Sequence, residues 1–264
     1  MLVAPGVRRL LAPNPSPLTG DGTNTYLVGD REVAVIDPGP ALAPHLEAIL
    51  AEVASCQGHI AALLVSHAHQ DHLPAAYLLR ERTGAPILAH ASIPGHDRAL
   101  VDGEPATAGS ADFIAFETPG HAREHLCFWL EAPRLLFTGD LVAGAGTVVL
   151  SEGAGALAAY LSSLRRMAAL GRSTILPGHG PVVPDGLGRI EEYLTHRADR
   201  DRQILKILRD GPASVDTLVR RIYRETPPTL RAMATRNVRA HLERLADQGN
   251  VKAQGNVWSL GSPD

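Results

Sequence analysis

Four residues of metal-ligand type lie within six positions of one another in the first third of the chain. They follow the apolar run Ala61–Val65 and are His67, His69, Asp71 and His72. On an extended backbone, side chains two positions apart share a face, so His67 and His69 can hold one ion together. Asp71 and His72 follow where the chain turns into an apparent helix and can be aimed at a second ion. This density of imidazole and carboxylate groups predicts a metal site.

Three later apolar segments each end in a glycine beside a residue of ligand type. These endings are Thr118-Pro119-Gly120-His121, Thr138-Gly139-Asp140 and Pro177-Gly178-His179. Glycine lets the backbone approach closely and turn where a side chain would clash. Open α/β folds place their sites at the edge where successive strands end. We therefore predict that all three endings deliver ligands to one sheet edge.

A hairpin signal precedes the first cluster. Residues 23–28 and 32–36 are predicted strands, separated by the turn residues Gly29-Asp30-Arg31. The second strand ends in Asp37-Pro38-Gly39. Asp37 is there either a turn former or an acceptor that orients a metal-bound histidine, and the spacing leaves both interpretations open.

Helices are predicted on both sides of the first cluster. Helical spacing of apolar residues favours a helix over 41–55, and a second helix is expected over Leu73–Arg82. A short strand is predicted at Ile87–His90. Residues 91–112 are polar and punctuated by glycine and proline, which predicts a loop over the mouth of the site. The order strand, helix, strand, helix, strand favours a layered α/β core.

The chain changes character near its C-terminal third. Residues 190–208 are predicted to form a long charged helix between two domains, and residues 212–264 show the helix, helix, hairpin outline of a winged helix. We therefore divide the chain into a catalytic domain over 1–186, a connecting helix over 187–211 and a winged-helix-like domain over 212–264.

Composition and charge limit the class of protein. The 264 residues are 45% hydrophobic and 20% charged, as in soluble globular proteins, and the net charge of −3 argues against general nucleic-acid binding. Residues 187–264 nevertheless carry 14 Lys and Arg against 10 Asp and Glu. A phosphate-facing set could be formed by Arg231, Arg236, Arg239 and Arg244. A solvated helix face is the preferred interpretation of these arginines.

Cysteine content and hydropathy indicate a cytoplasmic location. Cys56 and Cys127 are too few for a disulfide scaffold, so we expect them to serve packing. The sequence shows no signal peptide and no run of about 18 apolar residues, so no membrane association is predicted. A homo-oligomer is compatible with the sequence, which does not decide the oligomeric state.

In chain order, the motifs H-A-H-Q-D-H, T-P-G-H, T-G-D and P-G-H-G resemble those of the metallo-β-lactamase-fold hydrolases. The resemblance covers roughly residues 20–185. The winged-helix-like tail narrows it to the beta-lactamase-like-2 type, with a core similar to glyoxalase II. The family implies an α/β fold in which a four-layer αββα sandwich carries two metals at one edge of its paired sheets.

Carried over residue by residue, the resemblance implies a complete ligand set. One metal would be held by His67, His69 and His121, the other by Asp71, His72 and His179, with Asp140 bridging the two. The implied cofactor is Zn²⁺, two per chain, with iron or manganese as alternatives. A hydroxide bridging the metals would attack the substrate, and Asp71 would be both a ligand and the catalytic residue that orients this nucleophile.

The resemblance implies hydrolysis of an ester or thioester in a small molecule. A single-strand-specific endoribonuclease whose winged-helix tail helps to hold RNA is the main alternative. Mono-iron persulfide dioxygenase chemistry and a binding module without catalysis also stay open. Because His69 stands where the flavodiiron branch has a glutamate, that branch is disfavoured. Without an export signal, a lactamase role is the least favoured.

Overall fold

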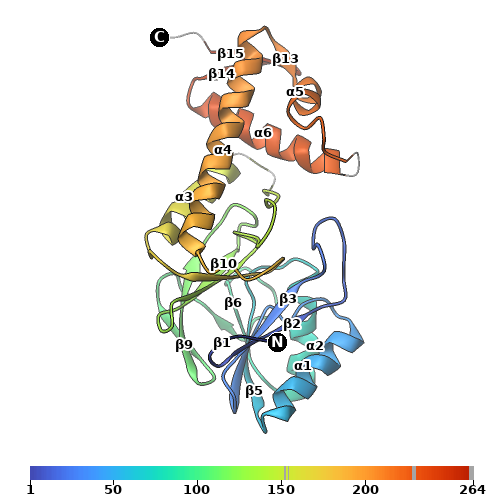
Figure 1. Ribbon diagram of the computed structural model, residues 1–264, viewed down its shortest axis with the longest axis vertical. Helices are drawn as coiled ribbons and strands as arrows, with labels where there is room; N and C mark the ends of the chain where they lie inside the picture. The colour runs from blue at the N-terminus through green and yellow to red at the C-terminus, as the bar shows by residue number, and fades with distance from the viewer. Residues whose placement is uncertain (152, 154, 228–229, 262–264) are drawn as a thin grey trace.

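Two β-sheets lie face to face, with helices on their outer sides and a smaller helical unit at one end (Figure 1). This architecture comes from a computed structural model that describes residues 1–151, 153, 155–227 and 230–261. Residues 262–264, the end of the predicted winged-helix-like domain, lie outside the described residues. The predicted αββα sandwich is confirmed.

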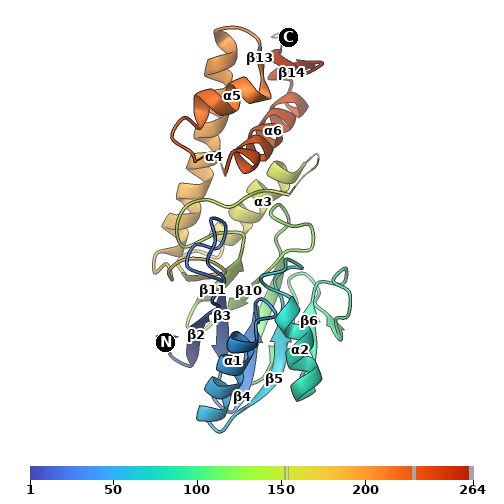
Figure 2. The same cartoon turned by 90° about the vertical axis from the view of Figure 1, so that its right-hand side faces the viewer.

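The first sheet contains seven strands in the order β1-β2-β3-β4-β5-β6-β7. Their bounds are β1 Leu2–Ala4, β2 Val7–Leu11, β3 Asn24–Val28, β4 Glu32–Ile36, β5 His59–Leu64, β6 Ile87–Ala89 and β7 Arg98–Ala99. Strands β1 to β4 pair antiparallel, whereas β4 to β7 pair parallel. The parallel pairs β4–β5 and β5–β6 are connected by α1 (Ala43–Ser55) and α2 (Pro74–Thr83), which cover the outer face of the sheet (Figure 2). The predicted hairpin and both predicted helices are confirmed.

The second sheet contains five strands in the order β12-β11-β10-β9-β8. Their bounds are β8 Pro105–Ala108, β9 Ala111–Glu117, β10 Leu126–Leu130, β11 Leu135–Gly139 and β12 Thr174–Pro177. Strands β11 and β12 are parallel, and α3 (Ala156–Ala168) lies between them in the sequence.

The prediction of a loop over residues 91–112 is wrong. This segment contains β7, β8 and the beginning of β9. Strand β8 is an edge strand whose buried side chains are only Ala106 and Ala108. Such small side chains give little apolar alternation, and Pro105 is tolerated because an edge strand leaves one side unpaired.

The main core lies between the two sheets. Aromatic side chains from both sheets meet there, with Tyr26 and Phe137 in an edge-to-face contact at 5.4 Å between ring centroids. A second apolar cluster joins the first sheet to α1 and α2, and a third joins the second sheet to α3 and to α4 (Gly186–Arg209). Because every layer is packed against another, the strand ends that carry the motifs are held on a rigid frame.

Helix α4 belongs to both parts of the molecule. Its first half packs against α3, and its last turns, with Ile204, Ile207 and Leu208, enter the core of the C-terminal unit. That unit contains β13 Ala213–Ser214, α5 Val215–Ile222, α6 Arg231–Asp247, β14 Val251–Gln254 and β15 Val257–Leu260. Strands β13, β15 and β14 form a small sheet, so the winged-helix outline is confirmed. None of the described helices is long and apolar enough to cross a membrane.

We expect Phe137→Ala to lower the free energy of unfolding by about 3–5 kcal/mol, because it opens a cavity between the sheets and removes the contact with Tyr26. Urea unfolding followed by tryptophan fluorescence measures this loss. Phe137→Leu keeps much of the apolar volume and should cost clearly less. Equal losses in the two variants would contradict this account of the core.

Candidate metal centre

All seven predicted ligand residues lie at one edge of the sandwich, where strands from both sheets end. The loop between β5 and α2 carries four of them, and the segments after β9, β11 and β12 carry one each. Their ligand atoms form two groups, each within 4.8 Å: His67, His69, His121 and Asp140 in the first, and Asp71, His72 and His179 in the second. The structure thus brings together residues separated by up to 112 positions in the sequence.

The first group is an arrangement of three imidazoles whose nitrogen atoms converge. His69 Nδ1 lies 2.9 Å from His67 Nε2 and 3.0 Å from His121 Nε2. Their ring centroids are 4.4 to 5.0 Å apart. Three nitrogen lone pairs directed at one point suit a single cation.

The second group combines two imidazoles with one carboxylate. His179 Nε2 lies 3.2 Å from Asp71 Oδ2 and 3.4 Å from His72 Nε2. Asp71 also accepts a hydrogen bond from Thr23 Oγ1 at 3.3 Å, which fixes its rotamer from the side of β3. This group offers two nitrogen ligands and one oxygen ligand.

Asp140 lies between the two groups, with one carboxylate oxygen toward each. Oδ2 lies 3.3 Å from His121 Nε2 in the first group. Oδ1 lies 3.3 Å from His179 Nε2 and 3.4 Å from His72 Nε2 in the second. Oδ1 is buried and makes no hydrogen bond within the described chain. A buried carboxylate whose two oxygens each face the histidine nitrogens of a different group fits a bridging ligand between two cations.

Backbone carbonyls fix the orientation of two of the imidazoles. His121 Nδ1 lies 2.7 Å from Val149 O, and His179 Nδ1 lies 3.2 Å from Gly22 O. Since a carbonyl only accepts hydrogen bonds, both Nδ1 atoms must carry the proton. Each Nε2, the nitrogen left for a metal to bind, then faces the site.

Asp37 orients a histidine from each group. Its Oδ2 lies 2.9 Å from His72 Nδ1 and accepts the hydroxyl of Ser66 at 2.8 Å. Ser66 Oγ in turn lies 2.9 Å from His67 Nδ1. Asp37 also accepts the Ser66 backbone N–H at 2.7 Å and has a φ of 47°. Both interpretations left open by the sequence therefore apply: Asp37 forms the turn and accepts from a site histidine.

Electrostatics divide the imidazoles into two kinds. Burial and the neighbouring His72 and His121 hold the pKa of His67 well below its usual range. Burial alone would also lower the pKa of His72 and His179, but nearby carboxylates outweigh it. Asp140 and Asp37 raise the pKa of His72 well above its usual range.

The pKa values of His179 and Asp71 shift in opposite directions. Burial alone would lower the pKa of His179 and raise the pKa of Asp71, but contacts between charged groups outweigh burial at both residues. Asp140 raises the pKa of His179 to about 9. The contact with His179 lowers the pKa of Asp71 to about 2. At pH 7 the second group therefore holds protons that a cation must displace, whereas His67 in the first group is neutral.

Sequence reasoning missed His125. This fully buried histidine lies four residues after His121, and its Nε2 accepts the backbone N–H of Asp140 at 3.1 Å. Its Nδ1 lies 2.8 Å from Thr118 Oγ1. His125 therefore fixes the backbone beneath Asp140, and the H-x-x-x-H spacing in H-A-R-E-H was the available signal. His90 and His96, by contrast, belong to neither group.

Two glycines of the motifs are required by close packing. A Cβ at Gly178 would lie 2.7 Å from His72 Cε1 and 2.8 Å from Asp140 Oδ1. A Cβ at Gly120 would lie 2.5 Å from the Cα of Tyr160 on α3. Both distances are far below van der Waals contact, so a side chain at either position would displace a site residue or a helix.

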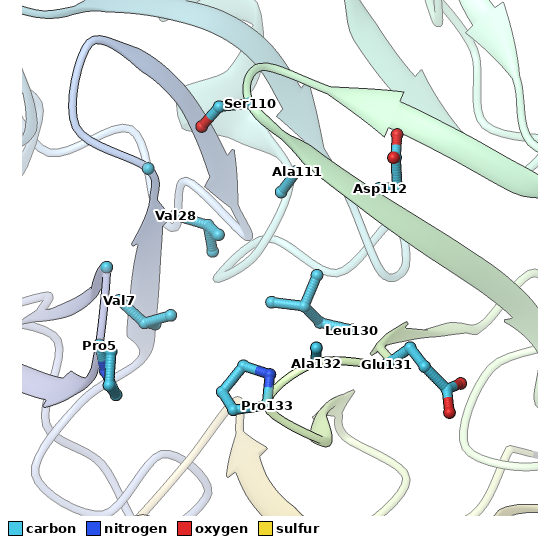
Figure 3. A pocket seen from close by; sticks show the side chains of 12 residues that line it. Pro5, Val7, Val28, Ser110, Ala111, Asp112, Leu130, Glu131, Ala132 and Pro133 are labelled. Carbon is cyan, nitrogen blue, oxygen red and sulfur yellow. The ribbon is translucent and has the colours of Figure 1, made fainter.

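A cavity of about 420 Å³ opens at the opposite end of the sandwich (Figure 3). It lies among the turns that join the strands there, and Val7, Val28, Leu130 and Pro133 contribute to its wall. None of its lining residues is a histidine or cysteine.

Comparisons with known proteins agree with the fold. Residues 18–179 match the family model of the metallo-beta-lactamase superfamily, and residues 214–258 match the beta-lactamase associated winged helix domain. The chain therefore belongs to the metallo-beta-lactamase superfamily, in the branch with a C-terminal winged helix, as the motifs indicated.

Among its relatives is a beta-lactamase-like protein 2 homolog of Caenorhabditis elegans, 32% identical over 93% of this chain and 86% of the relative. An atrochrysone carboxyl ACP thioesterase of Aspergillus chevalieri is 34% identical over 85% of this chain and 75% of the relative. The crystal structure of a beta-lactamase domain protein from Burkholderia ambifaria superposes with a TM-score of 0.88 at 23% identity, covering 99% of this chain and 93% of that one. The last likeness concerns the fold alone.

Asp37→Asn should weaken metal binding by about 10- to 100-fold, because the amide group places a donor where Ser66 and His72 also donate. Competition with a chromophoric chelator measures the affinity. Asp102→Asn is the matched control, since Asp102 also accepts a backbone N–H but lies outside the site. Unchanged affinity in Asp37→Asn would show that Asp37 only forms the turn.

Metal uptake by the metal-free protein should release protons at pH 7, since His179 has a pKa of about 9 and must lose its proton to bind a cation. The raised pKa stabilises the metal-free fold below pH 6.5, and this contribution is lost as the pH rises through about 9. Metal affinity should therefore increase over the same range. Calorimetric titration in buffers of different ionisation enthalpy counts the protons. His96→Ala should leave the count unchanged, and a count of zero at pH 7 would contradict the pKa assignment.

Proposed function

We propose that this chain is a metal-dependent hydrolase of thioesters or similar esters in small molecules. The observation that carries the proposal is the carboxylate of Asp140, buried between two groups of convergent ligand atoms. The thioester is supported by two relatives, 34% and 32% identical, that are each named atrochrysone carboxyl ACP thioesterase. Thioester hydrolysis breaks a C–S bond, forms a C–O bond and leaves a thiol and a carboxylate.

We propose zinc as the cation, with His67, His69 and His121 holding one ion, Asp71, His72 and His179 the other, and Asp140 bridging them. Five imidazoles and two carboxylates suit zinc, and also iron or manganese. When bound, such a pair supplies an acidified water at neutral pH and an electrophile for the carbonyl oxygen. Metal analysis of the purified protein identifies the ion.

The chain's own residues supply orientation. Asp71 is the more exposed of the two site carboxylates, with 26% of its side chain accessible against 11% for Asp140. It can therefore reach a water on the substrate side. Because its pKa is about 2, Asp71 is a poor base. Its proposed role is therefore to orient the attacking water.

The endoribonuclease alternative has weaker support. Of the four arginines considered for RNA, Arg244 forms an ion pair with Asp201 at 2.7 Å across the α4–α6 contact. On α5, Arg220 and Arg221 are also paired, with Asp216 and Asp210. These pairs leave fewer arginines available for phosphates than the sequence count suggested. We retain the division into a catalytic domain, a connecting helix and a winged-helix domain as part of the proposal.

A parallel assay on four substrate classes tests the proposed function. Metal-loaded protein is incubated with an acyl N-acetylcysteamine thioester, a lactone, a phosphodiester and single-stranded RNA, and turnover is compared at equal protein concentration. We expect thiol release from the thioester to be fastest. Cleavage of RNA or the phosphodiester with no thioester turnover would overturn the proposal.

Asp140→Ala should lose both metal content and hydrolysis together, by at least about 10²-fold in kcat/KM, because the bridging carboxylate contacts both groups. Metal analysis and the thioester assay are run on the same preparation. Asp102→Asn, away from the site, should behave as the parent protein. Parental turnover in Asp140→Ala would refute the two-metal site.

A further inference from the structure

We propose that Arg197 of α4 is a positioning residue for the first metal group, acting on His121 through two consecutive carbonyls of the segment after β11. This inference rests on the proposed metal centre, because His121 matters only if it binds a cation. The chain of contacts is short: Arg197 donates to Val148 O at 2.9 Å, and His121 Nδ1 donates to Val149 O at 2.7 Å.

The segment over 141–151 connects three of the proposed ligands. It begins directly after Asp140, and the Gly144 N–H donates to the carbonyl of His179 at 2.8 Å. At its other end, Ser151 donates both its N–H and its hydroxyl to Gly120 O, immediately before His121. The segment is therefore hydrogen-bonded beside His179 and His121, and among the proposed ligands only His121 contacts one of its carbonyls, Val149 O, through its side chain.

Helix α4 holds this segment by polar contacts at successive turns. The hydroxyl of Tyr193 accepts the Ala143 N–H at 3.0 Å, and Arg189 donates to Gly146 O at 2.8 Å. One turn beyond Tyr193, Arg197 reaches Val148 O. These contacts come from one face of a continuous helix, so the segment takes its shape from α4.

The burial of Arg197 indicates that its guanidinium has a specific role. It is 1% exposed, and its guanidinium lies over the ring of Tyr160 at 5.1 Å. Burying a guanidinium is costly unless it makes directed contacts, and no acidic partner pairs with it among the described residues. Arg197 instead contacts the Tyr160 ring and the Val148 carbonyl. A methionine would fill much of the same space at lower cost, which indicates a need for the donor itself.

Apolar packing alone cannot set the carbonyl directions. The side chains of Val148 and Leu150 are buried in the cluster around α3, which holds the segment in place. Packing of this kind is non-directional, whereas a hydrogen bond fixes the plane of its peptide group. The contact with Val148 O thus fixes one peptide plane, and the adjoining plane presents Val149 O to His121.

The experiment follows the loss of Co²⁺ from protein loaded with two equivalents, by visible absorbance after addition of excess chelator. In Arg197→Met we expect one equivalent to leave about tenfold faster or more and the other at the parental rate, because only the group with His121 is affected. Arg200→Met is the matched control. Arg200 lies three residues further along α4 and stacks on Tyr223 at 4.2 Å in the winged-helix unit.

The outcomes separate this inference from the proposed function. A parent protein that binds no Co²⁺ would overturn the metal centre itself. A parent that binds two equivalents, with parental release from folded Arg197→Met, would overturn the role of Arg197 alone. Equal acceleration in Arg200→Met would also overturn it, since the effect would then be a general loosening of α4. If Arg197→Met does not fold by circular dichroism, Arg197→Leu, which also lacks a donor, replaces it, and parental release from that variant counts against the role.

Discussion

The carboxylate of Asp140 is buried among the nitrogen atoms of histidines from two sheets, and this concentration of ligand atoms constrains the surrounding structure. A buried carboxylate oxygen without a hydrogen-bond donor is costly, so it requires opposite charge nearby. Imidazoles of both groups lie within 3.4 Å of this carboxylate, and His125 fixes the backbone of Asp140. The glycines of the motifs follow from the same crowding, since a Cβ at Gly178 would collide with the site.

Four of the five imidazoles are also held from outside the two groups. Asp37 accepts a hydrogen bond from His72 and is connected to His67 through Ser66. Backbone carbonyls accept hydrogen bonds from His121 and His179. These outer acceptors turn a cluster of histidines into a set with defined tautomers, which is what distinguishes a prepared metal site from histidines that merely lie together.

The seven proposed ligands could be singled out from the sequence because their signals are local, and the structure brings these residues together. His67 to His72 fall within six residues, and the later ligands each follow a glycine at a strand end. It failed where the signal depends on tertiary contacts. His125 has no direct role as a ligand in the predicted set, β8 buries only alanines, and Arg197 looks like any arginine of a charged helix until Val148 is seen beside it. Periodicity identifies elements, but it does not identify which carbonyl an arginine will meet.

The ligand-type residues come from both sheets of the sandwich. The loop after β5 belongs to the first sheet, whereas the segments after β9, β11 and β12 belong to the second. A cation bound by residues of both sheets would link the two layers. Separation of the layers on unfolding would then also release the cation. The thermal stability of the protein would then depend on the free metal concentration as well as on the apolar core.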